Sequence, residues 1–134
     1  MALWLVKSEP SAWSWQDQAL KKTTNWDGVR NFQARNYLKQ MRLGDRCFFY
    51  HSVVGKQIMG MVNVSKTYMP DPSDETGKFG MVEMSYLYPL NNPVSLELIK
   101  NTPALHDLPL LKQSRLSVMP ITVTQWQIIM DLAG

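Results

Sequence analysis

Short apolar runs separated by turns and short amphipathic segments dominate the pattern of hydrophobic and polar positions along the chain. Five runs have the length and composition of strands, and strands are expected at residues 2–7, 46–52, 57–66, 81–88 and 117–123. Capping residues and near-helical apolar spacing predict helices at 14–20, 32–41, 95–101, 108–113 and 124–132. Loops are expected at 23–28 and 70–78, and Pro89 is expected to end the fourth strand.

The order of these elements indicates an α+β fold. The strands do not alternate with long helices, which disfavours a doubly wound parallel sheet. Five to six strands with short helices inserted between them favour a mixed sheet that closes into a barrel. Gly60 lies inside the third run and indicates a bulge or a close backbone approach, as at a barrel corner. With 134 residues and no linker, residues 1–134 are expected to form one domain around one core.

Charge narrows the class of partner only when its placement is considered. The net charge is +3 and the pI is about 9.1, which is compatible with a nucleic-acid partner. Half of the fourteen basic residues fall in one stretch: Lys21, Lys22, Arg30, Arg35, Lys39, Arg42 and Arg46. This cluster predicts either a surface that attracts phosphate groups or a solvated helix face.

Residues suited to catalysis are scarce. The only histidines are His51 and His106, and the only cysteine is Cys47, so the spacing makes no zinc signature. Cys47 and His51 lie four positions apart on a predicted strand, about 13 Å from each other, and cannot form a nucleophilic pair. There is no glycine-rich phosphate loop and no nucleophile elbow. We therefore expect no enzymatic activity, no metal and no cofactor.

The sequence also bounds the expected compartment. A single cysteine within an apolar run predicts a buried small hydrophobe and no internal disulfide, as expected in a reducing compartment. No apolar stretch approaches the roughly 20 residues that span a bilayer. The first residues lack a charged n-region and predict a strand instead of a signal peptide. We expect a cytoplasmic protein that does not bind membranes.

Tryptophan is the most informative residue type, with five in the chain. Trp4 and Trp126 lie in apolar periodic runs and are expected in the core. Of Trp13 and Trp15, one is expected to be packed and the other half-exposed. Trp26 lies between Asn25 and Asp27-Gly28 on a predicted loop, where it either offers a stacking surface or folds back as a lid over the core.

Several blocks together resemble the EVE domain family, and in particular its bacterial members. They are Lys7-Ser8-Glu9-Pro10, Trp26 to Asn31 with Gln33-Ala34-Arg35, Met41 with Gly44-Asp45, Phe49-Tyr50-His51-Ser52, Tyr68 to Pro72, and Arg115 to Pro120. The resemblance runs from residue 2 to the C-terminus. It implies a PUA-like barrel related to YTH domains. It also implies an aromatic pocket for a modified base, such as a methylated or oxidised cytosine, with Lys7-Ser8 at its edge and Trp26 as its stacking wall.

Combining the residues with the resemblance gives a predicted site. The predicted base-binding pocket consists of Lys7, Ser8, Glu9, Trp26, Asn31, Tyr50, His51 and Ser117. The predicted phosphate contacts are Arg30, Arg35, Lys39, Arg42 and Arg115. Two of these residues have alternatives: a core histidine with one backbone partner for His51, and a bridge to a carboxylate for Arg115.

The leading functional hypothesis is a monomeric reader of modified bases in DNA. An RNA-binding module with the same fold is the nearest alternative. A small hydrolase using His51 and Glu9, or a protein-interaction scaffold, would belong to other classes. Eukaryotic members of the family carry a basic N-terminal extension that is not seen in this sequence, which favours a cytoplasmic prokaryotic setting.

Overall fold

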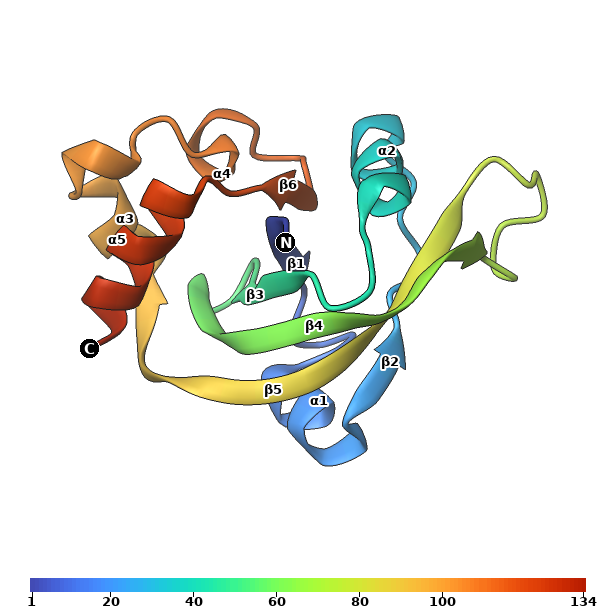
Figure 1. Ribbon diagram of the computed structural model, residues 1–134, viewed down its shortest axis with the longest axis horizontal. Helices are drawn as coiled ribbons and strands as arrows, with labels where there is room; N and C mark the ends of the chain where they lie inside the picture. The colour runs from blue at the N-terminus through green and yellow to red at the C-terminus, as the bar shows by residue number, and fades with distance from the viewer.

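One strongly curved sheet organises the backbone of the computed structural model, which describes residues 1–134 (Figure 1). Its strands are β1 (Leu3–Ser8), β2 (Thr23–Asn25), β3 (Arg46–His51), β4 (Gln57–Pro70), β5 (Gly80–Ser95) and β6 (Val118–Pro120). The helices are α1 (Trp15–Lys21), α2 (Phe32–Gln40), α3 (Leu96–Lys100), α4 (Pro109–Lys112) and α5 (Val123–Ala133), with a 3₁₀ turn at Pro103–Leu105. None of these helices has the length and apolar character needed to cross a membrane.

The strand order is β2-β5-β4-β3-β1-β6, with β1 and β3 parallel and every other pair antiparallel. The predicted α+β class and mixed sheet are therefore confirmed. The expectation of closure needs a correction, because the edge strands β2 and β6 do not pair with each other. Each has only three residues, and α2 packs against β6 and against β5, between the two ends of the sheet.

Two differences from the predicted elements concern β5 and its neighbour. β5 does not stop at Pro89 but continues through Pro93. Beyond Ser85 it has lost its partner β2, so one edge is free and a residue without an N–H is tolerated there. The predicted loop at 23–28 contains β2, which lines up antiparallel with residues 83–85 of β5.

The helix starts follow the capping residues closely. Ser14 forms a capping box with Asp17 at the start of α1, and the Asn31 side chain accepts a hydrogen bond from the Ala34 N–H at the start of α2. The cap of the last helix is Thr122, two residues before the predicted cap Thr124, so the helix begins at Val123.

The core confirms the expectations for the apolar tryptophans and the cysteine. Trp4 and Trp126 are buried, and Trp126 stacks on Phe48 with ring centroids 3.8 Å apart. Trp15 is buried while Trp13 is half-buried. Burial also raises the pKa of the Cys47 thiol, so that it is an apolar core group and not a nucleophile at neutral pH.

Candidate functional site

A cleft of about 280 Å³ lies where the end of β1 meets β2. Three segments form its walls: the end of β1 with the turn that follows it, the residues just before α1, and β2 with the two residues after it. The lining residues are Lys7, Ser8, Glu9, Ala12, Trp13, Thr24, Asn25, Trp26 and Asp27. The cleft therefore combines two indoles with two carboxylates and one ammonium group.

Trp26 borders this cleft although its ring is mostly packed. Its exposed fraction is 7%, and the ring meets Phe49 edge-on with centroids 5.6 Å apart. Its backbone N–H donates to the Val82 carbonyl at 2.7 Å. Both alternatives from the sequence thus describe part of the arrangement: the indole covers core residues and still has a hollow beside it.

Trp13 is the second aromatic wall, and it was absent from the predicted site. Its indole Nε1 donates to the Gln18 Oε1 at 2.9 Å, and Gln18 is completely buried. The Gln18 amide in turn donates to the carbonyls of Lys22 and Met84. The Ser8 hydroxyl donates to the Trp13 carbonyl. Ser8 and Gln18 therefore fix the position of Trp13. The available signal was a tryptophan three residues after Pro10, with serines at positions 11 and 14.

The charged groups of the cleft are only lightly engaged by the protein. Glu9 Oε1 accepts a hydrogen bond from the Ser11 hydroxyl, while Asp27 has no side-chain partner and is exposed. Lys7 Nζ donates to the Ser114 carbonyl at 3.0 Å and forms no ion pair. Partial burial lowers the pKa of Lys7 from its ordinary range. The carboxylates are thus free to accept hydrogen bonds from a ligand.

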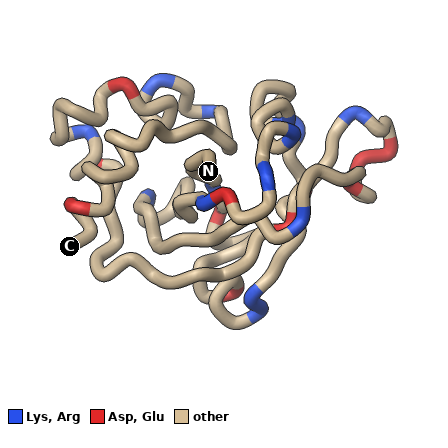
Figure 2. The backbone as a smooth tube through the Cα atoms, in the orientation of Figure 1, with Lys and Arg blue, Asp and Glu red and all other residues tan.

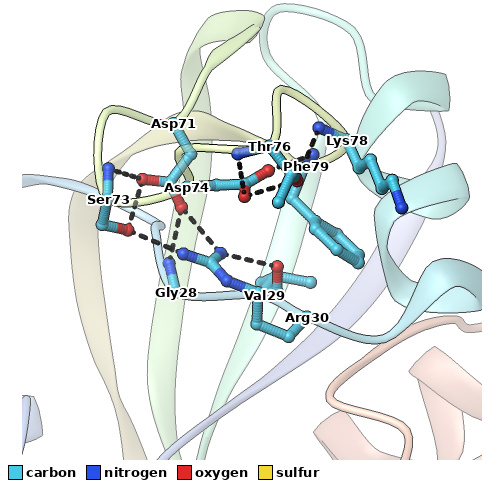
Figure 3. A network of polar contacts seen from close by, with 9 residues as sticks. All are labelled: Gly28, Val29, Arg30, Asp71, Ser73, Asp74, Thr76, Lys78 and Phe79. Carbon is cyan, nitrogen blue, oxygen red and sulfur yellow. Dashed lines mark hydrogen bonds and ion pairs between the residues drawn. The ribbon is translucent and has the colours of Figure 1, made fainter.

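A buried carboxylate holds the segment that follows Trp26 (Figure 3). Asp71 accepts from the Gly28 N–H at 2.9 Å, from the Arg30 guanidinium at 3.1 Å, and from both the N–H and the hydroxyl of Ser73. Burial by itself raises the pKa of Asp71, but these hydrogen bonds outweigh it and lower the pKa to about 2. These contacts fix the backbone directly after the cleft residues Trp26 and Asp27.

This network also engages Arg30, one of the predicted phosphate contacts. Its guanidinium donates to Asp71, to Ser73 and to the Val29 carbonyl, and its contact with a phosphate group stays a prediction. Arg35 is similarly engaged, donating to Asn36 and to the Lys78 carbonyl.

Two other predicted phosphate contacts, Lys39 near the end of α2 and Arg42 just after it, lie far from the cleft. Lys39 and Arg42 line a different cavity of about 810 Å³, together with residues at the start of β1. The cleft lies at the other end of β1, about 16 Å away for a strand of this length. Lys and Arg residues are spread along several elements of the backbone (Figure 2). The predicted set of phosphate contacts is therefore not assembled beside the base pocket.

Four of the eight predicted pocket residues line the cleft, and the other four do not. Asn31 is exposed, and its side-chain oxygen caps α2. His51 is buried, and its Nε2 accepts from the Trp15 N–H at 2.9 Å, as in the alternative of a core histidine with one backbone partner. Tyr50 lines a separate cavity, and the Ser117 carbonyl accepts from the Lys7 N–H.

The positions of Arg115, Glu9 and His51 bear on the bridging role considered for Arg115 and on the hydrolase hypothesis. Arg115 is exposed and pairs with no carboxylate, which corrects the bridging alternative. Glu9 lies at the cleft, but the His51 ring lies in the core with its acceptor nitrogen engaged, so these two groups are not brought together as an acid–base pair. No group of three or more His, Cys, Asp and Glu side chains is placed to hold a metal ion.

Solved structures share this architecture over its whole length. A Rhodopseudomonas palustris protein solved by NMR is 45% identical with a TM-score of 0.94, covering 100% of this chain and 94% of that one. The human THYN1 protein, solved in complex with DNA containing 5-methylcytosine, is 30% identical with a TM-score of 0.93, covering 100% and 98%. The YTH domain of the Zygosaccharomyces rouxii MRB1 protein has the same fold at 16% identity, with a TM-score of 0.62 and coverage of 99% and 86%.

Sequence comparison agrees with these structures. Human thymocyte nuclear protein 1 is 31% identical over 163 aligned positions, which cover 96% of this chain and 72% of the human protein. The sequence model of the EVE domain matches residues 2–132. The chain therefore belongs to the EVE domain family.

Proposed function

We propose that this domain binds a single base of DNA, a cytosine carrying a small substituent such as a methyl group, in the cleft between Trp13 and Trp26. The observation that carries the proposal is the composition of that cleft: two indoles and two carboxylates border one hollow of about 280 Å³. This volume lies near the lower end of the range for small-molecule sites, as suits one base better than a larger ligand.

Stacking supplies a first part of the binding energy. A base against an aromatic side chain gains about 1–3 kcal/mol, and the cleft offers indoles on two of its walls. Extruding a base from a duplex costs a few kcal/mol, so stacking alone roughly offsets the extrusion. Net binding therefore needs hydrogen bonds to the base edge and contacts to phosphate groups.

The carboxylates decide which base edge is favoured. Glu9 and Asp27 are acceptors, and an acceptor pairs with the exocyclic amine of cytosine or adenine. Guanine also carries an exocyclic amine, at N2, whereas thymine has none and its O4 atom is itself an acceptor. The cleft thus favours an amine-bearing base.

The relatives favour cytosine among these bases. Human THYN1, which has the same fold and is 30% identical, was solved with DNA containing 5-methylcytosine. A single methyl group adds about 0.8 kcal/mol when buried, or about fourfold in affinity. We therefore expect a modest preference for the methylated base unless the fit around the methyl group is close.

Fluorescence anisotropy with labelled oligonucleotides tests this proposal. The panel has one variable base per strand (cytosine, 5-methylcytosine, 5-hydroxymethylcytosine or N6-methyladenine) in matched DNA and RNA, single- and double-stranded. The Trp13→Ala variant should bind at least about tenfold more weakly, because one stacking wall is lost. Phe32→Ala removes an exposed aromatic ring of α2 outside the cleft and should leave binding unchanged.

Three results would contradict the proposal in different ways. Equal affinity for every base would reject a base-specific reader. Tighter binding of the RNA strands would replace DNA by RNA as the ligand. Full affinity of Trp13→Ala, with a normal unfolding temperature, would place the binding site outside the cleft.

A further inference from the structure

A second cavity, of about 440 Å³, lies beside the cleft and shares Lys7 with it. Its polar lining residues are Lys7, Tyr50, Ser52, Lys56 and Ser114. No Asp or Glu lines this cavity, whereas the cleft has two carboxylates. The two neighbouring hollows therefore differ in the charge of the group that each would attract.

The polar groups of the second cavity are short of partners within the protein. Tyr50 is 2% exposed, yet its hydroxyl forms no hydrogen bond and still reaches the cavity. Burial raises the pKa of Tyr50, so this hydroxyl keeps its proton and is a donor at neutral pH. Lys56 forms no ion pair, and Lys7 donates only to a carbonyl. An anion in this cavity would accept hydrogen bonds from these donors.

The sheet register explains why the two hollows are adjacent. Lys7 of β1 is directly opposite Tyr50 on the parallel strand β3, so both side chains lie on the same face of the sheet. The next residue, Ser8, points to the other face and contacts Trp13 at the cleft. The Ser52 N–H donates to the Ser8 carbonyl at 3.0 Å, which ties the rims of the two hollows together.

The loop that forms one rim of the second cavity is strained. Val53 has φ = 69° and Lys56 has φ = 23°, both in a region that β-branched and long side chains rarely adopt. Such strain costs about 1–3 kcal/mol per residue and is concentrated at binding and catalytic sites. Here it places Lys56 at the cavity and leaves Val53 and Val54 exposed at the loop tip.

We infer that the second cavity binds a phosphate group of the nucleic-acid strand, at the linkage next to the base held between Trp13 and Trp26. This inference rests on the proposed function and names the path of the strand: from the cleft, across Lys7, to Tyr50 and Lys56. An anion there would also offset the cost of keeping the Lys7 ammonium partly buried. The basic residues of α2 have no part in this contact.

Neutral linkages test the inference directly. A methylphosphonate is placed on the 5′ or the 3′ side of the single modified base in a DNA strand, which removes one negative charge at a known position. One of the two positions should weaken binding by about tenfold. The Lys56→Ala variant should lose a similar factor on the fully charged strand and nothing further on that neutral strand, because the two changes remove the same contact.

Two further variants sharpen the result. Tyr50→Phe removes only the hydroxyl and keeps the buried ring, and it should weaken binding of the charged strand but not of the neutral one. Lys78→Ala, in the loop between β4 and β5 and also outside any ion pair, is the matched control and should change nothing beyond a small salt-dependent factor. Independent, multiplying losses for Lys56→Ala and the neutral linkage would overturn the inference.

Small ligands separate this inference from the proposed function. If 5-methyldeoxycytidine binds but its 5′- and 3′-monophosphates bind no more tightly, the base site stands and the phosphate site is rejected. If inorganic phosphate competes with the monophosphates in the wild type and not in Lys56→Ala, the phosphate site stands by itself. If the monophosphates bind but 5-methyldeoxycytidine itself does not, the result counts against the base site.

Discussion

The indole of Trp15 lies against the backbone of Gly60, where a Cβ atom on residue 60 would overlap three atoms of the ring. The same indole packs edge-on against Phe49, with ring centroids 5.1 Å apart, and the backbone N–H of Trp15 donates to the His51 imidazole. Gly60 thus allows α1 to lie directly on the sheet.

Gly60→Ala should therefore lower the free energy of unfolding by about 1–3 kcal/mol, because the added methyl group has no room. Chemical denaturation monitored by circular dichroism measures the change. In a Trp15→Leu background, the same substitution should cost much less. An equal cost in both backgrounds would mean that the indole is not the obstacle.

The buried His51 predicts a simple pH dependence of the protein's stability. Burial lowers the pKa of His51 below its ordinary value, so the unfolded chain binds this proton more readily than the folded one. His51 thus contributes stability that is fully present above about pH 6.5 and is lost as the pH falls through its folded pKa. The unfolding temperature should fall between about pH 7 and pH 5.

Replacing each histidine in turn assigns this effect. His51→Gln should lower stability at pH 7 and flatten the decline towards acid, because no buried imidazole remains to be protonated. His106→Gln, at an exposed position, should leave the decline unchanged. An unchanged acid decline in His51→Gln would exclude this group as its source.

Asp71 should affect the pH dependence of stability at much lower pH than His51 does. Its pKa falls from the ordinary 3.8 to about 2, equivalent to about 2 kcal/mol of stability, present above about pH 4 and lost as the pH falls through about 2. Asp71→Asn should remove about that amount at pH 7. Asp131→Asn, on an exposed turn of α5, is the control and should change stability little.

Because Asp71 fixes the segment after Trp26, its loss should also reach the cleft. Asp71→Asn should weaken binding of the 5-methylcytosine oligonucleotide even at a temperature where the variant is fully folded. Unchanged affinity in a destabilised variant would restrict Asp71 to a role in stability.

Gln18 should act on binding through Trp13. Gln18→Met fills the same space but leaves the Trp13 Nε1 and the carbonyls of Lys22 and Met84 without their partner, which should cost about 1–3 kcal/mol of stability. Anisotropy should show weaker oligonucleotide binding, while near-ultraviolet circular dichroism reports a looser indole. Full affinity would show that Trp13 keeps its place without Gln18.

Local chemistry in the sequence was sufficient to predict much of the fold. Ser14 and Asn31 were recognisable as helix caps because their side chains satisfy N–H groups only a few residues away. Gly60 was recognisable as a close approach, since a strand seldom has a glycine without such a reason. The family resemblance added the six-block pattern that pointed to Lys7, Ser8, Glu9 and Trp26 as members of one site.

The tertiary structure decided the rest, because it depends on contacts between residues far apart in the chain. The parallel register of β1 and β3 places Tyr50 beside Lys7, and Tyr50 lines the second cavity instead of the cleft. The buried Asp71 accepts a hydrogen bond from Arg30, 41 positions away in the sequence. Local sequence patterns carry no record of such pairings, so only the tertiary structure shows that the cleft and the second cavity are separate.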